Sequence, residues 1–573
     1  MSLIDDLKHL FEAFAANPPI ILSPDECRDE YDKSRKVFNR RFDFMPSAIV
    51  QVKNTAQVAT LIEHATKHDI EIAVKSGGHD HEGECVATGK LLIDFQLMNN
   101  VNVYQAQLPS STEQAFGVRI QPGAIFEKIK AELDTYHLGI PHGTCQSVAI
   151  AGYTMGGGWG PWTRKYGMGC ERLIGATIVL GDGTVKYLGV SAELNQEPIL
   201  SDREPQSDPD QNNSILWALR GGGGLSYGIV TELVFKPFKL PKIAQSFVIK
   251  SDSFPALEKV KAVDIIAAWE QLTAPGQNPN LIGTNLKVNA KGVKCVSEIS
   301  ENALLSWQLN GHFGGTKTEL ETMMTQWAYY LVSLINQDPG LTDTEKQQQK
   351  NDVIHEFNEF YQRTCAHAVE FNAATNHTGY SLDFDSWDRE LGGIQLETDE
   401  PAPHKITSRM PTSNWGSAGR QALVRSLQST LLDGDATDSN IAAYITLGAI
   451  SGQYYSDKQQ LSEQDKVSCA FPYQDRPFTI QYQAWWDQPA QGNEPADIAK
   501  LISTRFYENR AQDWIESCRS FDIPDTKGAF ISFKDAAVKT EDYFGDSYES
   551  LIGVKLDQSQ DSKCLFRSRK TII

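Results

Sequence analysis

Apolar and polar positions in the first 236 residues follow a pattern of short alternating strands and helices. Residues 46–52 have the apolar content of a strand, residues 55–68 repeat apolar side chains at helical spacing, and residues 70–74 alternate as a strand. Together they predict a βαβ unit that runs into the glycine turn at Gly77 and Gly78. Further predicted elements are a helix over 124–136 and strands over 90–95, 117–121, 170–180 and 229–235.

The pattern changes after Pro237, where glycine clusters thin out and strands mix with long polar helices. A long helix is predicted over 342–373, and the chain end returns to short strand-like pieces around 528–533. These features predict an α+β fold with a second domain in the middle of the chain. The strands predicted for this domain are 247–251, 285–289, 304–312, 441–446 and 478–485.

Composition narrows the class of protein. A chain of 573 residues is long enough for two or three domains. Its formal net charge of -20 argues against a nucleic-acid partner and against an anionic membrane surface, because both require clustered cations. No apolar stretch approaches the ~20 residues of a membrane span, and no secretory signal is visible, so we expect a cytoplasmic protein.

Cysteine and histidine spacing gives no sign of a metal site. The nine cysteines are odd in number and form no CxxC pair, which argues against a zinc site and against a disulfide framework. His64 and His68 lie one helical turn apart, but no third ligand is evident. We therefore predict no bound metal and interpret this histidine pair as a solvated helix face.

Two glycine-rich segments carry the candidate chemistry. The first is Ser76-Gly77-Gly78-His79, and the second joins Cys145 to a glycine run at 156–160. Backbone N–H groups in such turns can cradle a pyrophosphate, although a Gly-Gly pair after a strand is equally often only a tight turn. Cys145 taken alone is more often a buried thiol than a nucleophile. No GxGxxG occurs, so a Rossmann dinucleotide site is not expected.

The order of several motifs supplies a more specific hypothesis. Residues 46–94, with their Ser-Gly-Gly-His turn, resemble the FAD-binding domain of the vanillyl-alcohol oxidase / p-cresol methylhydroxylase (PCMH-type) superfamily. Residues 143–148, 156–160, 219–231 and 542–545 resemble its berberine-bridge-enzyme-like (BBE-like) branch. Any one of these motifs is weak evidence, but their common order covers nearly the whole chain.

The resemblance implies a domain plan. An FAD-binding domain would comprise residues 1–236, and residues 520–573 would form a C-terminal segment that returns to it. Residues 237–519 would form a substrate domain with an antiparallel sheet backed by helices. The flavin would lie between the two domains, where cofactor sites commonly form.

The resemblance also implies how the flavin is held. His79 matches the histidine that bonds the flavin 8α-methyl carbon, and Cys145 matches the cysteine that bonds flavin C6, so FAD would be bicovalent. Val148 matches an oxygen gate at which a small residue is associated with oxidases, although a valine can also simply pack. The other cofactor-binding residues implied are Lys75, Ser76, Gly77, Gly78, Gly152, Gly157, Gly228, Ile229, Val230 and Tyr543.

The chain departs from its relatives where they carry catalytic tyrosines. Those places hold His81, Trp159 and the segment 530–535, so the usual phenolic base is absent. We interpret His81 as the first replacement base, since a histidine with an ordinary pKa is mostly neutral at pH 7. A histidine that only hydrogen-bonds within the flavin loop fits equally well, and His142 is a weaker candidate base.

Two glutamines add a polar side to the expected substrate site. Gln481 and Gln483 alternate on one face of a predicted strand, where they could orient a substrate or serve the sheet. Trp159 is the remaining candidate active-site residue. We predict an FAD-dependent oxidase that transfers hydride to flavin N5 from an alcohol, phenol or amine of specialised metabolism. The alternatives are a carbohydrate oxidase acting at the anomeric carbon and a flavin-binding protein without turnover.

The same interpretation sets the expected partners. They are a small-molecule substrate and dioxygen, which would be reduced to hydrogen peroxide. The sequence does not separate a monomer from a homodimer.

Overall fold

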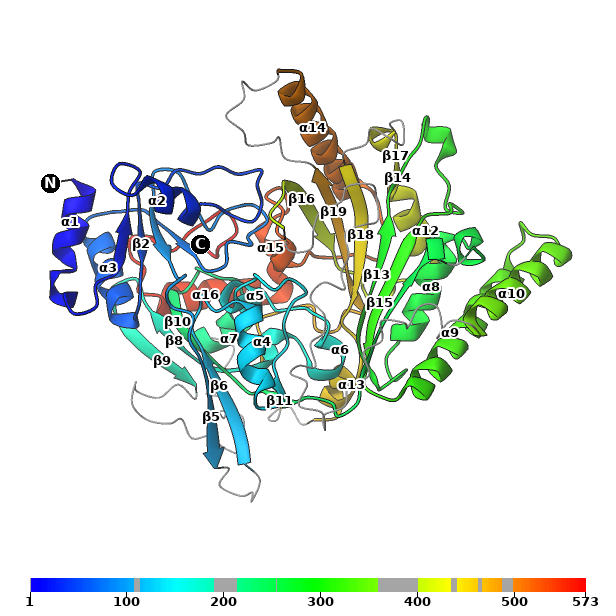
Figure 1. Ribbon diagram of the computed structural model, residues 1–573, viewed down its shortest axis with the longest axis horizontal. Coiled ribbons are helices and arrows are strands. Elements are labelled where there is room, and N and C mark those ends of the chain that lie inside the picture. Colours follow the sequence, from blue (N-terminus) through cyan, green and yellow to red (C-terminus); the bar gives the residue numbers. More distant parts are fainter. Residues whose placement is uncertain are drawn as a thin grey trace.

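The computed structural model describes residues 2–107, 114–189, 214–253, 255–358, 400–433, 441–461, 466–486 and 498–573. Two halves lie side by side (Figure 1). One half is built from both ends of the chain and contains both termini, while the other is built from the middle of the sequence. Helices and strands are mixed in both, which confirms the predicted α+β class.

The first half opens with the predicted βαβ unit. Helix α3 (Thr55–Lys67) begins after Asn54, whose side chain accepts a hydrogen bond from the Gln57 backbone. Its apolar face is buried against a four-stranded sheet in which β2, β4 and β3 are parallel. The strand order is β1 (Ile20–Leu22), β2 (Ala48–Gln51), β4 (Leu91–Asp94) and β3 (Ile72–Lys75). The loop of residues 76–79 therefore leaves the carboxyl end of β3.

A second, antiparallel sheet completes this half. Its order is β5 (Val101–Gln107), β6 (Gln114–Ile120), β10 (Ile229–Phe235), β8 (Leu173–Val179) and β9 (Val185–Gly189). Short helices pack beside it, among them α4 (Phe126–Asp134), α5 (Ile150–Met155) and α7 (Ile215–Leu219), whereas α6 (Thr163–Tyr166) packs against strand β13 of the other half. The C-terminal helices α15 (Thr540–Phe544) and α16 (Tyr548–Gln558) share the same core, through Phe544 and Leu551.

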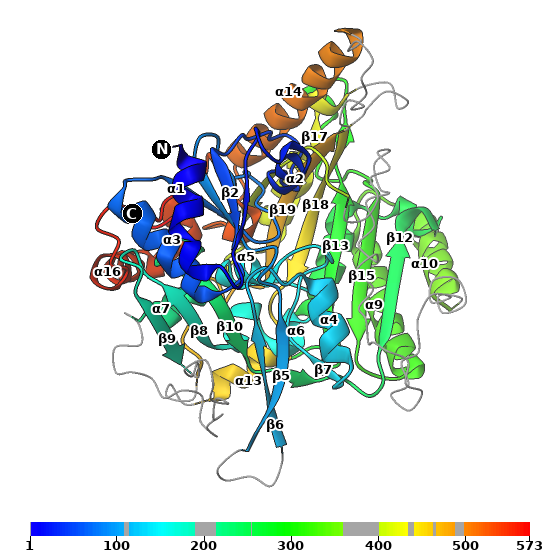
Figure 2. The same cartoon turned by 60° about the vertical axis from the view of Figure 1, so that its left-hand side comes forward.

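The middle of the chain forms one six-stranded antiparallel sheet. Its order is β12 (Gln245–Lys250), β15 (Trp307–Phe313), β13 (Leu281–Asn289), β18 (Ile441–Ala449), β19 (Phe478–Trp486) and β16 (His404–Arg409). Helices cover the face turned away from the first half (Figures 1 and 2), namely α8 (Ala262–Thr273), α9 (Lys317–Gln337), α10 (Asp343–Asn358), α12 (Ser417–Ser426) and α14 (Ile498–Ser520).

Strand β19 shows why this sheet has two different faces. Ile480, Tyr482 and Ala484 are fully buried in the core under the helices. Gln481 and Gln483 alternate with them and face the first half. The period-two pattern of this strand therefore places polar groups at the boundary between the halves.

Some elements differ from the sequence predictions. The segment 528–533 forms no strand, because its backbone bonds to the Ser408 hydroxyl and closes a 3-10 turn over Ile531–Phe533 instead. Strand β16 was not predicted. Helix α10 covers the first part of the predicted 342–373 helix, and residues 359–373 lie outside the described part of the chain.

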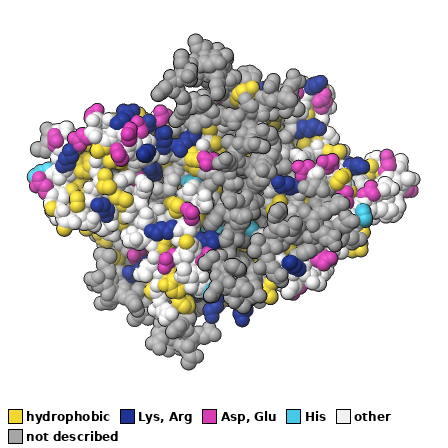
Figure 3. Space-filling view, in the orientation of Figure 1, with side chains coloured by type: hydrophobic (Ala, Val, Ile, Leu, Met, Phe, Trp, Pro, Cys, Tyr) yellow, Lys and Arg dark blue, Asp and Glu magenta, His cyan; other side chains and the backbone are white. Residues whose placement is uncertain are grey.

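Three features of the described residues bear on possible partners, namely surface charge, helix character and clusters of metal-binding side chains. On the face shown in Figure 3, cationic and anionic side chains are interspersed over the described residues. Among the helices described, none combines the length and apolar character that crossing a bilayer requires. The described residues also contain no group of three or more His, Cys, Asp or Glu able to hold a metal ion. His64 instead contacts Asp6, with Nε2 and Oδ2 2.9 Å apart.

Candidate functional site

A cavity of about 420 Å³ lies between the two halves of the molecule. Glycine-rich loops of the first half form one wall, and the polar faces of β13, β15, β18 and β19 form the other. The predicted site residues that line it are Ser76, Gly77, Gly78, His79, His81, Cys145, Val148, Gly152, Trp159, Gly228, Ile229, Val230, Gln481 and Gln483.

The loops that carry His79 and Cys145 are in direct contact. A Cβ added to Gly77 would lie 2.8 Å from the Ala149 backbone nitrogen, so only glycine permits this approach. His79 Nε2 lies 2.7 Å from the Ser147 hydroxyl, and its ring stacks on Phe38 with centroids 4.1 Å apart. An oriented imidazole and the half-buried Cys145 thiol therefore share one end of the cavity.

The first wall is largely backbone, which suits a flat anionic cofactor. A Cβ added to Gly152 would meet nothing within 4 Å, so this position of helix α5 opens onto the cavity. Gly78 has φ +77° and Gly228 has φ +152°, conformations that side chains disfavour. Glycine backbone that can be approached closely, beside a histidine and a cysteine, fits an extended flavin dinucleotide.

Three residues expected to hold the cofactor do not line the cavity. The Lys75 ammonium forms an ion pair with Asp94 at 3.3 Å under the first sheet. The Tyr543 hydroxyl accepts from the Asp535 N–H at 2.8 Å and donates to its carbonyl at 3.0 Å. The Cβ position of Gly157 faces the Phe471 and Phe530 rings. In this structure Lys75, Gly157 and Tyr543 support the frame of the site, and their contact with the cofactor stays a prediction.

Gln483 is held in one orientation on the opposite wall. Its Oε1 accepts from the Tyr444 hydroxyl and from Trp485 Nε1, both at 3.1 Å. Its Nε2 donates to the Thr446 hydroxyl at 3.3 Å. The neighbouring Gln481 donates to the Thr479 hydroxyl at 2.9 Å. This wall is thus a network of pre-oriented polar groups.

Trp159 contributes a ring face and no proton-transfer group. Its Nε1 donates to the Ala449 carbonyl at 2.9 Å. The indole lies against Gly448, where an added Cβ would come within 2.4 Å of the ring. The residue therefore shapes the cavity beside β18.

The two candidate histidine bases have different surroundings. Burial lowers the pKa of both His81 and His142 to about 4, so both are neutral at pH 7. Both ring nitrogens of His142 are engaged, with the Gly143 carbonyl at 2.8 Å and Trp162 Nε1 at 2.7 Å. His81 lines the cavity, and its Nδ1 lies 2.9 Å from Nε2 of His404.

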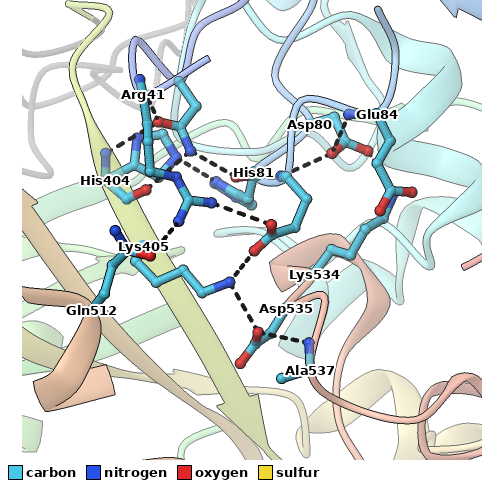
Figure 4. Close-up of polar contacts among 12 residues, drawn as sticks. Arg41, Asp80, His81, Glu84, His404, Lys405, Gln512, Lys534, Asp535 and Ala537 are labelled. Carbon is cyan, nitrogen blue, oxygen red and sulfur yellow. Dashed lines mark hydrogen bonds and ion pairs between the residues drawn. The ribbon is translucent and has the colours of Figure 1, made fainter. Parts of the chain in front are cut away.

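Buried charges fix the loop of His81 to the rest of the molecule (Figure 4). The Asp80 carboxylate pairs with Lys534 at 2.5 Å, and Glu82 pairs with Lys405, which also contacts Asp535 at 3.0 Å. Burial alone would raise the pKa of Asp80, but the Lys534 ammonium holds it below its usual range. The segment 530–535, where relatives were expected to place tyrosines, here supplies anchoring charges.

Sequence reasoning missed His404. It lies at the start of β16, is fully buried, and is 323 residues away from His81 in the sequence. The rest of strand β16 is mostly polar, so the sequence lacks the alternation of apolar and polar residues that predicts a strand. A single sequence carries no signal for this long-range pairing.

The part of the chain that carries the two candidate flavin-bonding residues matches a known family of FAD-binding domains. Residues 46–189 match the family model of the FAD binding domain. This segment contains both His79 and Cys145, so the part of the glycine-rich wall that carries them lies within the match.

Several proteins are similar to the chain in sequence, and several solved structures are similar in fold. Glucooligosaccharide oxidase of Sarocladium strictum is 26% identical over 303 residues, which are 52% of this chain and 51% of that protein. Berberine bridge enzyme-like 19 of Arabidopsis thaliana is 22% identical over 93% of this chain and 80% of its own length. A solved structure titled for the 6-S-cysteinyl, 8α-N1-histidyl FAD of Acremonium strictum glucooligosaccharide oxidase has a TM-score of 0.65. It is 18% identical and covers 99% of this chain and 98% of its own.

The chain is a homologue of the BBE-like and PCMH-type FAD oxidoreductases, as its motif order predicted. The match to glucooligosaccharide oxidase spans about half the length of that relative.

Proposed function

We propose that the protein is an FAD-dependent oxidase of a small polar molecule. The observation that carries the proposal is the cavity itself, in which the His79 and Cys145 loops meet beside a glycine wall and face a polar wall. FAD bound there supplies the redox chemistry, accepting a hydride from a substrate carbon and passing two electrons to dioxygen to give hydrogen peroxide.

We further propose that His79 and Cys145 both bond to the flavin. Covalent attachment needs an unprotonated nitrogen or sulfur nucleophile held in a fixed position. Ser147 and Phe38 orient the imidazole, and the Cys145 thiol lies on the touching loop. The solved structure of Acremonium strictum glucooligosaccharide oxidase is described as holding a 6-S-cysteinyl, 8α-N1-histidyl FAD, which has the same two kinds of bond in that protein.

The opposite wall defines the class of substrate. It presents amide, hydroxyl and indole groups from Asn285, Asn310, Tyr444, Gln481 and Trp485. His81 is neutral and faces the same space, so it would accept the proton of a substrate O–H or N–H. An alcohol, phenol or amine meets both requirements.

A carbohydrate is the second candidate substrate. Glucooligosaccharide and chitooligosaccharide oxidases are among the relatives, and a polar wall with aromatic faces also suits a sugar. Peroxide release from a panel of oligosaccharides and aromatic alcohols separates the two classes. Activity with oligosaccharides alone would replace the metabolite assignment.

Acid precipitation tests the flavin linkage directly. The purified protein should keep its yellow colour in the pellet, and H79A and C145A should each retain flavin through the remaining bond. The double variant should release all flavin to the supernatant. A wild-type supernatant that carries the flavin would refute covalent attachment.

Anaerobic substrate addition tests turnover. Bleaching of the flavin absorbance followed by recovery in air is expected for an oxidase. Persistent colour with every member of both panels would leave a flavin-binding protein without turnover.

A further inference from the structure

Two histidines from distant parts of the chain lie one behind the other at the cavity wall, with their rings nearly perpendicular. His81 lines the cavity, whereas His404 is fully buried behind it and does not line it. Nδ1 of His81 and Nε2 of His404 are 2.9 Å apart (Figure 4). Through this nitrogen pair, the hydrogen bonding of the buried His404 acts on the cavity by way of His81.

The hydrogen bonds of His404 determine which nitrogen of His81 carries a proton. The Ala402 carbonyl oxygen can only accept, and it lies 2.9 Å from His404 Nδ1, so this nitrogen carries the hydrogen. In a neutral His404, Nε2 is then an acceptor. It receives the Nδ1–H of His81, which leaves the lone pair of neutral His81 on Nε2.

The pair is held by a dedicated polar side chain. Asn39 is fully buried and donates through Nδ2 to the His81 carbonyl at 2.6 Å and to the His404 carbonyl at 3.0 Å. Its Oδ1 accepts from the His404 backbone at 3.1 Å. Trp485 covers the His404 ring, with centroids 4.0 Å apart. These contacts fix both backbones and one ring, as a tautomer-selecting pair requires.

Charges surround the pair from each adjoining element. Asp80 and Glu82 flank His81 on its own loop, Lys534 approaches from the C-terminal segment, and Lys405 follows His404 on β16. The carboxylates favour a positive charge on His81, and the two lysines oppose it.

We propose that His404 is a positioning residue that keeps His81 in the Nδ1–H tautomer, so that Nε2 of His81 takes the proton from substrate. This rests on the proposed oxidase function. The substrate O–H bond breaks with its electron pair left on oxygen, and the proton forms an N–H bond at Nε2. The hydrogen bond to His404 persists in the resulting imidazolium, which returns its proton to solvent.

Two variants of His404 separate positioning from packing. In H404Q the amide oxygen replaces Nε2 as acceptor, whereas H404F keeps an aromatic ring but has no acceptor. H404F should lower kcat about 100-fold with little change in KM, while H404Q should retain most of the activity. H81A/H404F should be no slower than H81A, because His404 acts through His81. Equal kcat in H404F and wild type, or additive losses in the double variant, would overturn the proposal.

Nuclear magnetic resonance of ¹⁵N-histidine-labelled protein gives a readout independent of turnover. The signals of His81, one of 12 histidines, are identified by their absence in H81A. Wild type and H404Q should show His81 protonated at Nδ1, and H404F should shift it toward the Nε2–H form. An Nε2–H tautomer in wild type would refute the role of His404. If the wild-type protein shows the expected His81 tautomer but forms no peroxide with any substrate of the panel, the oxidase function is refuted and the effect of His404 on the tautomer is not.

Discussion

At the residue scale, hydrogen-bond partners and access decide what each histidine can do. His81 and His142 share a pKa lowered to about 4 by burial. His142 has both nitrogens engaged by Gly143 and Trp162, and so serves the structure. His81 has one nitrogen engaged by His404 and lines the cavity. Of these two histidines, only His81 keeps a lone pair on a ring nitrogen that can accept a proton from substrate.

The pH dependence of kcat/KM should report His81. The imidazole is neutral above about pH 4, so activity should persist from pH 7 down to pH 5 and be lost as pH falls through about 4. Peroxide release over this range measures the profile, with flavin absorbance as the control for cofactor loss. H81A should lose about 100-fold in kcat/KM and lose this acid limb. A limb near pH 6.5 in wild type would contradict a buried His81.

At the element scale, the site depends on the contact between two loops that leave different elements. The loop after β3 carries His79, and the loop before α5 carries Cys145. Gly77 is where they touch, since an added Cβ would lie 2.8 Å from the Ala149 nitrogen and 3.0 Å from the Ser147 oxygen. Neither backbone atom can move away without displacing its loop.

G77A should therefore separate the two loops. We expect a loss of about 1–3 kcal/mol in unfolding free energy and a loss of covalently retained flavin. G553A is the matched control, because an added Cβ there meets nothing within 4 Å in helix α16. It should be neutral or stabilising by about 0.5–1 kcal/mol. Urea unfolding and acid-precipitated flavin measure both effects, and G77A with full flavin retention would show that the loops tolerate separation.

The sequence predicts those elements whose stabilising contacts join residues that are close together in the chain. The βαβ unit before His79 was visible because helical and strand periods alternate within 30 residues. Strand β16 was not, because its pairing with β19 joins residues 404–409 to 480–485 and its own pattern is polar. His404 and Asn39 belong to contacts of this long-range kind. Lys75, Gly157 and Tyr543 were predicted at the cofactor but do not line the cavity, because a motif gives proximity in sequence and not the direction of a side chain.

At the scale of the whole molecule, buried ion pairs join the halves around the cavity. Glu82 of the first half is 3% exposed and pairs with Lys405 of β16, and with Arg41 at 3.2 Å. Lys405 in turn contacts Asp535 near the chain end. Three distant segments thus meet behind His81, and the cavity keeps its shape only while they remain together.

E82Q should weaken this junction. Two buried cations would lose one carboxylate, which typically costs about 3 kcal/mol of unfolding free energy. E26Q is the matched control, because the Lys8–Glu26 pair is half exposed and solvent screens its attraction, so its loss should change the unfolding free energy little. Urea unfolding at pH 7 compares the two variants. Equal losses in E82Q and E26Q would show that the junction is not a principal source of stability.

Stability of the whole molecule should decline in mild acid because buried histidines stay neutral. Burial lowers the pKa of His142 to about 4 and that of His312 to about 3, against about 6.5 when unfolded. Between the folded and the unfolded pKa values, the unfolded chain binds more protons than the folded chain. The free energy of unfolding is therefore highest above pH 6.5 and falls as the pH drops towards the folded pKa values. At pH 5 each histidine should cost roughly 2 kcal/mol.

Variants assign this acid sensitivity to particular histidines. The difference in urea-unfolding free energy between pH 7 and pH 5 should shrink by roughly 2 kcal/mol in H312Q, which removes one titrating group. H355Q, at an exposed position of α10, should leave that difference unchanged. An unaltered pH dependence in H312Q would mean that His312 becomes protonated within the native core.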